Sequence, residues 1–591
     1  MEMEKMIASG GDGGVPELED PVVARPAAEE EKESRRRRPL LVAVLAALLL
    51  LAFFVLGRES TSTVWEMASA KLLAVVNNDA AAATHHHDDG ELAGNVTNRN
   101  DVDELLGGLL TAGMDRRSCR SRYESSWYYK HFPYKPSTHL LGKLRAYEAR
   151  HRRCAPGTPL YAMAVDHLKS GGGADEAAME ECRYIVWLPF DGLGNRMLSM
   201  ASGFLYALLT DRVFLVALPP DSDELFCEPF PDTTWRLPLE DFPIANLFNL
   251  GPNPDVSLTA LLNSKKIVVD VDDTDDQAAV AATPLPAYVY LSLGWEMTDV
   301  AFFCGEHQAA LEKVSWLLLY SDLYFVPSLY PIAKFQDELR LLFPAAMESI
   351  SHLLLRYLFH PSNTVWGMVT RYYHSYLAHA DRRIGIQIRM FNFGAIPVDD
   401  MYNQILACSR QEHILLETDG GSDAVDDTAT ATISGGGSDT ILVVSLYADY
   451  YERLRSRYYE HAAAKRGGDT WVGVFQPTHE ERQATESLAH NQKALAEVYL
   501  LSFSDELITT GRSTFGYVSS SLAGVRPTIL LTALGHKVPE TPCQRAVSMD
   551  PCNHKPPRGV VCWRGMAVDR DDLARHVRVC EDYDIGVKLF D

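Results

Sequence analysis

Strands and helices alternate on both sides of the middle of this 591-residue chain, and this pattern constrains the fold more than any other feature. In the first half, an apolar run at 184–188 precedes a Gly-rich turn, a helix from Met197 to about Leu209 and a second apolar run at 213–216. The second half repeats the alternation from Ile384 onward. Such alternation is typical of parallel sheets with helices on both faces. The sequence therefore predicts an α/β fold with two doubly wound Rossmann-type lobes and a cleft between them.

Arg389 is the main candidate for binding an anion. It follows a run in which Ile384, Ile386 and Ile388 alternate with Gly385 and Gln387, the period of a strand with one buried face. In open α/β sheets, ligands bind outside the carboxyl ends of the strands. A guanidinium group suits a phosphate or pyrophosphate, because it donates two parallel hydrogen bonds and keeps its charge at any working pH. The alternative is an ion pair between the arginine and a nearby carboxylate.

A second candidate is the turn after the predicted strand at 507–510. It contains Gly511–Thr514 and leads into a helix that starts at Phe515. Ser513 or Thr514 is a natural N-cap, so a hydroxyl group and free amides converge where doubly wound domains hold nucleotide phosphates. The alternative is a plain capped helix without a ligand.

The Gly-rich turn Gly192–Arg196 has the same position after the first strand at 184–188. Its glycines let the backbone approach a ligand, and free amides at the start of the next helix favour an anion or a polar sugar. The run does not match G-x-G-x-x-G, so it gives little support to a nicotinamide cofactor. A tight turn without any ligand is the alternative.

Acidic residues offer two further hypotheses. The run Asp270–Asp276 resembles the D-x-D signature of metal-dependent glycosyltransferases, but such short motifs arise by chance in a chain with 79 Asp and Glu residues. Asp299 precedes Phe302–Cys304, and an apolar, strand-like segment follows. Such a carboxylate can lie at a desolvated cleft edge with a raised pKa, as a general base requires. A solvated loop aspartate is the alternative, and the sequence alone favours it.

The amino-terminal region predicts a membrane anchor. Arg35–Arg38 precede an unbroken apolar run, Leu40–Leu56, which is long enough to span a thin bilayer. Basic residues on the amino side place that end in the cytosol, so the rest of the chain is expected to be lumenal. The alternative is a signal peptide cleaved near Ala68–Ala70. The formal net charge of −24 argues against general binding to nucleic acid.

The cysteines fit a lumenal location. All ten lie beyond the apolar run, and four of them, from Cys543 to Cys580, fall in the last fifty residues. Disulfides are expected in an oxidising compartment, and these four suggest a tail fastened to the body of the protein. Their spacing does not form a paired C-x-x-C zinc site. Asn95 begins a glycosylation sequon, Asn-Val-Thr, in the low-complexity segment after the anchor.

Ten ordered stretches give the chain a specific resemblance over residues 101–591. They are Leu105–Leu110, Ser121–Tyr123, Pro133–Pro136, Gly192–Arg196, Leu225–Pro231, Tyr324–Leu329, His360–Asn363, Gly385–Phe391, Lys493–Glu497 and Ser513–Val518. On these stretches the chain resembles the plant xyloglucan fucosyltransferase family. The family consists of single-pass type II Golgi enzymes that transfer L-fucose from GDP-fucose to cell-wall glycans. The resemblance implies a two-lobed GT-B fold and a metal-independent, inverting glycosyl transfer without a cofactor.

The resemblance also implies roles for the candidate residues. Arg389 would bind the GDP pyrophosphate as the main catalytic residue, and Asp299 would be a candidate base. The other donor-binding positions would be Gln387, Ser513, Thr514, Phe515 and Gly516. Arg512 departs from the small or aromatic residue expected there and would add a second phosphate contact. Gly192, Gly194, Asn195 and Arg196 would lie across the cleft, on the acceptor side.

Together these inferences divide the chain as follows: a cytosolic tail at 1–38, an anchor at 39–57, a stem at 58–100, an acceptor-side lobe at 101–380, a donor-binding lobe at 381–535 and a Cys-rich tail at 536–591. The acceptor is expected to be galactose of xyloglucan or a sugar of arabinogalactan protein. Two other functions stay open: a metal-dependent transferase using Asp270–Asp276, and a catalytically silent glycan-binding protein of the same fold. A homodimer is a further expectation for an anchored enzyme with a stem.

Overall fold

Residues 100–591 form one compact unit in the computed structural model of the chain. The structure describes residues 105–171, 181–251, 254–267, 286–344, 348–418, 437–463, 471–533, 535–558, 562 and 576–590. The predicted anchor at 39–57, the sequon at Asn95 and the acidic run Asp270–Asp276 lie outside these residues. Within the described residues, no helix combines the length and the apolar character needed to cross a bilayer.

The first sheet has four parallel strands in the order β2-β1-β4-β3. Their bounds are β1 Tyr184–Leu188, β2 Val213–Val216, β3 Tyr288–Ser292 and β4 Trp316–Tyr320. The sequence predicted β1 and β2 with these bounds, and it placed all of β4 except Trp316 within a longer apolar segment, Leu317–Pro327. It missed β3. Nearly every residue of the four strands is buried, as expected for a parallel sheet with both faces covered.

The second sheet has six strands in the order β10-β9-β8-β5-β6-β7, and only β10 runs antiparallel to its neighbour. Their bounds are β5 Arg382–Ile388, β6 Ser438–Ser445, β7 Trp471–Phe475, β8 Glu506–Thr510, β9 Thr528–Leu530 and β10 Cys543–Arg545. The prediction of two lobes built on parallel sheets is therefore confirmed.

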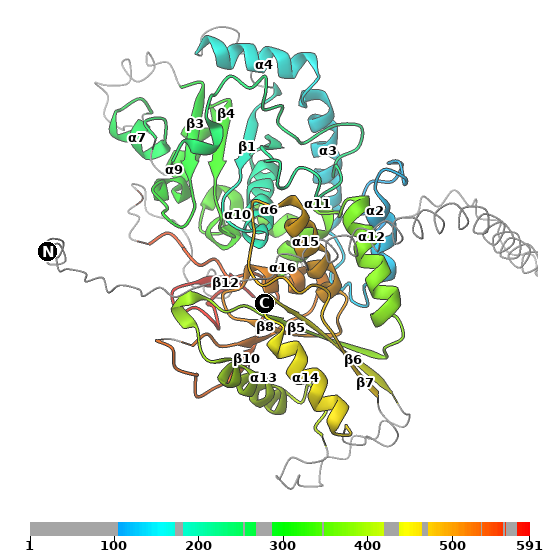
Figure 1. Cartoon of the computed structure of the whole chain (residues 1–591). Helices are drawn as coiled ribbons and strands as arrows, with labels where there is room; N and C mark the ends of the chain where they lie inside the picture. Colours follow the sequence, from blue (N-terminus) through cyan, green and yellow to red (C-terminus); the bar gives the residue numbers. More distant parts are fainter. Residues whose placement is uncertain are drawn as a thin grey trace, which may run out of the picture. The chain divides into compact units, whose positions relative to one another are not determined.

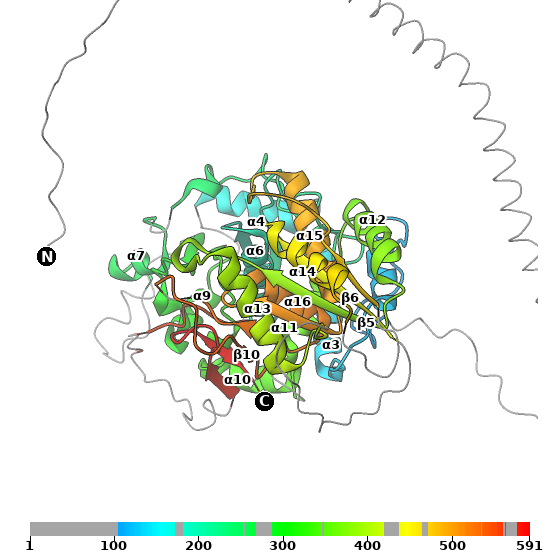
Figure 2. The same cartoon turned by 60° about the horizontal axis from the view of Figure 1, so that its bottom comes forward.

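Helices cover both sheets and fill the space between them (Figure 1). The helices of the described residues are α2 Arg120–Glu124, α3 Thr138–Cys154, α4 Pro159–Ser170, α6 Leu193–Leu209, α7 Leu258–Asn263, α9 Gly305–Glu312, α10 Ala333–Leu342, α11 Ser349–Leu358, α12 Asn363–Tyr372, α13 Val398–Glu412, α14 Asp449–Glu460, α15 Leu488–Ser502 and α16 Thr514–Ala523. Figure 2 shows α13 and α14 over the outer face of the second sheet. One buried apolar cluster joins residues of α6 and α11 to residues of α15 and α16, so the two lobes share a continuous core.

Strand β5 differs from its prediction in one respect. The alternation of Ile384, Ile386 and Ile388 predicted one buried face, but Gly385 and Gln387 are buried as well. The reason is the central position of β5, where helices cover both faces of the sheet. A Cβ atom on Gly385 would lie 2.7 Å from both Leu507 Cδ2 and Ser504 Oγ, so the second face has no room for a larger residue.

The strand order fixes where a ligand can bind. In the first sheet, β2 lies on one side of β1 while β4 and β3 lie on the other; in the second sheet, β6 and β8 flank β5 in the same way. Loops after such paired central strands diverge to opposite faces and leave a crevice between them. Such a place, where the chain changes the direction in which it adds strands, is called a switch point. The first sheet has its switch point between β1 and β4, and the second has its switch point between β5 and β8.

Five disulfides confirm the expectation for the cysteines. They pair Cys119 with Cys227, Cys154 with Cys182, Cys304 with Cys562, Cys408 with Cys543, and Cys552 with Cys580. Cys304 lies before α9 in the first lobe, and Cys408 lies on α13 in the second. The carboxyl-terminal tail, which includes the hairpin of β11 Val577–Val579 and β12 Val587–Leu589, is therefore covalently fastened to both lobes.

Candidate active site

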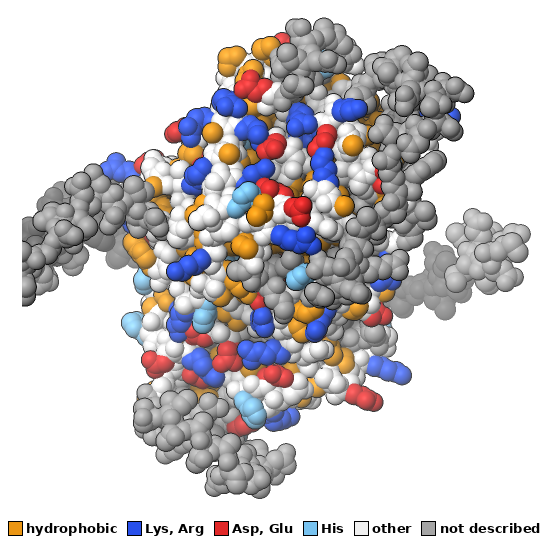
Figure 3. All heavy atoms as spheres, turned by 180° about the vertical axis from the view of Figure 1, so that it is seen from behind, with side chains coloured by type: hydrophobic (Ala, Val, Ile, Leu, Met, Phe, Trp, Pro, Cys, Tyr) orange, Lys and Arg blue, Asp and Glu red, His pale blue; other side chains and the backbone are white. Residues whose placement is uncertain are grey.

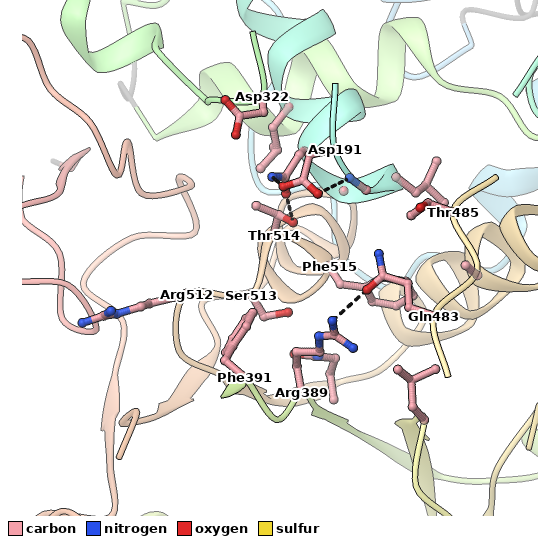
Figure 4. A pocket seen from close by; sticks show the side chains of 18 of the residues that line it. Asp191, Asp322, Arg389, Phe391, Gln483, Thr485, Arg512, Ser513, Thr514 and Phe515 are labelled. Carbon is pink, nitrogen blue, oxygen red and sulfur yellow. Dashed lines mark hydrogen bonds between the residues drawn. The ribbon is translucent and has the colours of Figure 1, made fainter. Parts of the chain in front are cut away.

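A cavity of about 780 Å³ opens where the two switch points face each other. Its walls come from the loops that follow β1, β3 and β4 in the first lobe and β5, β6, β7 and β8 in the second, from helix α15, and from the carboxyl-terminal tail. Figure 4 shows Asp191 and Asp322 on one wall and Arg389 with Phe391 on the other. Nine of the predicted site residues line it: Gly192, Gly194, Asn195, Gln387, Arg389, Arg512, Ser513, Thr514 and Phe515.

Arg389 presents a positive charge to this cavity. Its backbone N–H donates to Thr510 Oγ1 at 3.0 Å, which fixes the end of β5 against the end of β8. Its guanidinium group donates to Gln483 Oε1 at 2.7 Å, a neutral partner (Figure 4). No carboxylate in the described part of the chain forms an ion pair with Arg389, so the alternative of a structural ion pair is not what the structure shows. The charge is available to an anion.

The turn between β8 and α16 brings amides to the same cavity. Ser513 is the N-cap of α16, and its side chain makes no capping hydrogen bond. The N–H groups in the first turn of a helix have no intrahelical acceptors, and they favour a negative charge. Gln387 supports this turn, because its Oε1 accepts the N–H of Thr510 at 3.3 Å. A Cβ atom on Gly516 would lie 2.8 Å from Thr509 Cβ, so only glycine fits there.

Arg512 has the left-handed backbone conformation, with φ of 63°. Its backbone N–H donates to Asp582 Oδ2 at 2.6 Å and its Nε to Asp582 O at 3.2 Å. Its guanidinium carbon lies 4.3 Å from the centre of the Tyr583 ring, so the tail holds this side chain. In Figure 4 Arg512 points away from Arg389, and the two guanidinium groups do not converge. The expected second phosphate contact stays a prediction.

On the opposite wall, the turn after β1 is organised by Asp191. Its carboxylate accepts the backbone N–H of Gly192 at 2.8 Å and the side-chain amide of Asn195 at 2.7 Å. Arg196 does not line the cavity; its guanidinium pairs with Asp221 at 2.6 Å. The prediction that Arg196 faces the cleft is therefore wrong, because a carboxylate on the following loop holds it against the first lobe.

The same turn contacts the second lobe directly. Thr514 Oγ1 donates to Asn195 Oδ1 at 2.5 Å, so the starts of α6 and α16 touch. A Cβ atom on Gly194 would lie 2.7 Å from Thr514 Oγ1 and 2.9 Å from the carbonyl carbon of Thr514. Gly194 thus has a packing role, since any other residue would separate the two helix ends.

Comparison with known proteins identifies the family. A sequence model described as "Xyloglucan fucosyltransferase" matches residues 71–561, which is more than half of the chain. The chain belongs to the xyloglucan fucosyltransferase family. Among its relatives, the galactoside 2-alpha-L-fucosyltransferase of Arabidopsis thaliana is 45% identical over 500 residues, covering 84% of each chain. The enzyme of that name from Pisum sativum is 43% identical over 492 residues, covering 83% of this chain and 82% of its own.

A solved structure agrees with this assignment. An Arg-to-Lys mutant of Arabidopsis thaliana FUT1 in complex with GDP superimposes with a TM-score of 0.71 at 43% identity. The match covers 82% of this chain and 100% of that one. The resemblance seen in the sequence motifs is therefore confirmed, and the fold is that of a fucosyltransferase of this family.

Within the xyloglucan fucosyltransferase fold, Asp299 occupies an unexpected place. It is fully buried and does not line the cavity. Its Oδ1 accepts the N–H of Thr259 in the first turn of α7, and its Oδ2 accepts the N–H of Ser292 at the end of β3, both at 2.7 Å. Burial raises the pKa of this carboxyl, as expected. Its predicted position at the cleft edge is wrong, however, because both oxygens are used to join two segments of the first lobe.

Four carboxyl groups line the cavity that were not among the predicted site residues, those of Asp191, Asp322, Glu480 and Glu497, and burial raises the pKa of two of them. Asp322 follows β4 by two residues and lines the first-lobe wall, where burial and the neighbouring Asp191 raise its pKa to about 6. Glu497 on α15 accepts the Thr478 hydroxyl at 2.6 Å, and burial raises its pKa to about 8. An acidic residue just after a buried strand is a signal that would have identified Asp322. Nothing local in the sequence distinguishes Glu497 from a surface residue of a helix.

Replacing Gly194 by Ala is expected to damage both activity and stability. The added methyl group would overlap backbone atoms of Thr514, and overpacking of this kind costs about 1–3 kcal/mol. Because the two helix ends border the cavity, turnover should fall by about 10-fold or more at saturating substrate. Thermal unfolding and transfer kinetics measure the two effects.

Gly142 provides the matched control. It is an exposed residue in the second turn of α3, where an added Cβ atom would meet nothing within 4 Å. Gly142→Ala should leave activity unchanged and raise stability slightly, since Ala favours a helix over Gly by about 1 kcal/mol. Equal behaviour of the two variants would disprove the packing role of Gly194.

Proposed function

We propose that this protein transfers L-fucose from GDP-fucose, with inversion, to galactose of xyloglucan, with arabinogalactan protein as the alternative acceptor. The observation that carries the proposal is the charge of Arg389 at a switch point, beside the amino terminus of α16, with no carboxylate of the described residues paired to it. The similar FUT1 structure, which contains GDP, supports a nucleotide diphosphate as the ligand on this side. The relatives named galactoside 2-alpha-L-fucosyltransferase support the transferred sugar and a galactoside acceptor.

In this mechanism the second lobe acts mainly on the leaving group. As the bond between fucose C1 and the phosphate oxygen breaks, negative charge builds on the pyrophosphate of GDP. Arg389 and the amides at the start of α16 would stabilise that charge, because fixed donors cost no reorganisation at the moment of reaction. The acceptor hydroxyl would attack from the side of the first lobe. Asp299 takes no part in this step, because the first lobe encloses it.

We propose further that the transfer needs no metal ion. In the described residues, two groups of side chains bring three potential metal-ligand atoms close together. One group is Cys304, Glu306 and Cys562, and the other is Cys552, Cys580 and Asp582. The cysteines of both groups form disulfides and so offer no thiolate ligand. With Arg389 in the pyrophosphate position, a cationic side chain takes the place that a divalent cation fills in metal-dependent transferases.

The proposed location is the Golgi membrane, with a single type II anchor at 39–57 and a lumenal catalytic unit. The apolar run, the basic residues before it and the disulfides support this topology. The face in Figure 3 intersperses basic and acidic side chains. That pattern is consistent with binding of an anionic donor by local groups in the cavity and not by a charged surface. Pairing of two copies through the catalytic unit is a further proposal.

The test uses the compact unit 100–591, secreted through an oxidising route so that the disulfides form. It is incubated with GDP-fucose and excess EDTA, with xyloglucan and arabinogalactan in separate tubes, and release of GDP is followed. We expect release that depends on xyloglucan and is unchanged by EDTA. Release that stops with EDTA would contradict the metal-independent mechanism. No release in either tube with GDP still bound would point to another acceptor, whereas glycan binding without any GDP binding would support the silent glycan-binding alternative.

A further inference from the structure

The first-lobe wall of the cavity carries two exposed aromatic rings. Phe190 is 37% exposed and Trp295 is 46% exposed, and both line the cavity. Each ring is held in place by another side chain. The Tyr320 ring lies 4.7 Å from the Phe190 ring, and the ammonium group of Lys555 lies 4.6 Å from the centre of the Trp295 ring. Fixed aromatic faces in a cavity usually contact a ligand.

Asp322 lies beside these rings. Its Oδ1 accepts the backbone N–H of Trp295 at 2.8 Å, which ties the carboxylate to the loop that follows β3. Gly294 makes this contact possible, because a Cβ atom there would lie 3.0 Å from Oδ1. Asp322 Oδ2 accepts no hydrogen bond from another residue of the described segments, and no basic side chain in them pairs with the carboxylate. This carboxylate therefore has hydrogen-bonding capacity for a ligand in the cavity (Figure 4).

The two walls differ in charge. The first-lobe wall holds the carboxylates of Asp191 and Asp322. The wall of the second lobe holds the guanidinium groups of Arg389 and Arg512, an ion pair between Lys493 and Glu480, and Glu497, whose pKa is raised by burial to about 8. A nucleotide diphosphate is attracted to Arg389 and repelled by the two carboxylates. A ligand on the first-lobe wall must be neutral, offer an apolar face to an aromatic ring, and offer hydroxyl groups to a carboxylate. A sugar ring has all three properties.

We propose that Phe190, Trp295 and Asp322 form a subsite for a neutral sugar ring of the oligosaccharide acceptor. The ring stacks on Trp295 or Phe190, and its hydroxyl groups donate to Asp322. This inference rests on the proposed function and adds where the acceptor is held. Asp322 acts in it by binding the acceptor, and no proton transfer is assigned to it.

The subsite gives acceptor binding a defined pH dependence. Burial, with Asp191 as a further cause, raises the pKa of Asp322 to about 6. The charged groups around it are Asp191 in the turn after β1, Glu296 in the loop after β3 and Lys555 in the carboxyl-terminal tail. Above pH 6 the carboxylate is ionised and forms the stronger, charge-assisted hydrogen bonds. As the pH falls through 6 it is protonated, and the acceptor KM should rise.

Two variants and one control test the subsite. Trp295→Ala removes the ring, and Asp322→Asn removes the charge with little change in shape; Trp127→Ala is the control, because Trp127 is 68% exposed and does not line the cavity. For both test variants we expect the KM for a galactosylated xyloglucan oligosaccharide to rise by at least about 10-fold. The Kd for GDP and the slow hydrolysis of GDP-fucose without acceptor should stay within about twofold of the parent values. Asp322→Asn should also lose the rise in KM below pH 6.

Direct binding separates failure of the subsite from failure of the proposed reaction. Calorimetric titration of the GDP-bound protein with the oligosaccharide should show binding that weakens in both test variants and not in Trp127→Ala. Unchanged binding and KM in both variants, or no binding by the parent protein, would overturn the subsite while leaving GDP-fucose cleavage intact. Absence of any GDP-fucose cleavage would instead overturn the proposed function, and weakened oligosaccharide binding in Trp295→Ala would still support the subsite.

Discussion

Replacing Arg389 by Ala is expected to lower kcat/KM for transfer by about 1,000-fold, or about 4 kcal/mol of transition-state stabilisation. The guanidinium group has no carboxylate partner in the described chain and donates to the neutral Gln483. Its removal therefore takes away the charge that opposes the pyrophosphate without leaving a buried counter-charge. The free energy of unfolding should change by less than about 1 kcal/mol, since only one side-chain hydrogen bond is lost. Steady-state kinetics and urea unfolding measure the two quantities.

Two further variants sharpen this test. Arg389→Lys keeps the charge but loses the two parallel donors, so its activity should fall between those of the parent and Arg389→Ala. Arg455→Ala is the matched control, because Arg455 is an exposed arginine of α14 outside the cavity. A folded Arg389→Ala enzyme with parental turnover would show that the pyrophosphate is stabilised elsewhere.

Replacing Asp299 by Ala is expected to destabilise the protein by about 2–5 kcal/mol, because it leaves two buried amides without an acceptor. The affected groups are the N–H of Thr259 in α7 and the N–H of Ser292 at the end of β3. Molecules that do fold should keep nearly parental kcat, since Asp299 does not line the cavity. Urea unfolding gives the stability, and active-site titration with GDP corrects kcat for the folded fraction.

The opposite outcome is equally clear. If Asp299 were the general base, Asp299→Ala would give a folded enzyme of parental stability with turnover reduced by about 100-fold or more. Asp337→Asn is the control for stability, because the side chain of Asp337 is 95% exposed and its weak contact with Arg340 contributes little. A loss of turnover at unchanged stability in Asp299→Ala would contradict the structural role, in which Asp299 joins α7 to the end of β3.

Much of the second lobe could be predicted from local sequence. The alternating run before Arg389 and the short strand before Ser513 each end where the chain turns into a loop, and parallel pairing of β5 with β8 brings these two ends together. Pattern alone therefore identified Arg389 and Ser513 as candidates for ligand binding, and the family resemblance added Gln387. It failed on the second face of β5, because the covering helices come from distant parts of the sequence.

The errors in the first lobe have a different cause. The sequence shows that Asp299 and Arg196 lie close to turns, but it does not show their partners. Tertiary folding pairs Asp299 with the N–H of Ser292 and Arg196 with Asp221. A carboxylate can serve backbone amides or a ligand, and residue type does not distinguish these uses. Asp322 was missed for a different reason: the predicted apolar segment ran past the end of β4 at Tyr320, so the position of Asp322 just after a strand was not recognised. The importance of Gly194 depends on a contact with Thr514, more than 300 residues further along the chain.

The fastening of the tail to both lobes also determines when the molecule can be completed. Cys304 and Cys408 are synthesised long before their partners Cys562 and Cys543, with separations of 258 and 135 residues. Translation is therefore nearly finished before either lobe can acquire its link to the tail, and a chain that ends before residue 543 would carry an unpaired thiol on each lobe. In the proposed lumenal location, prematurely terminated chains would thus carry two reactive thiols that thiol-dependent retention can recognise, so oxidation of the tail would act as a check on completed synthesis.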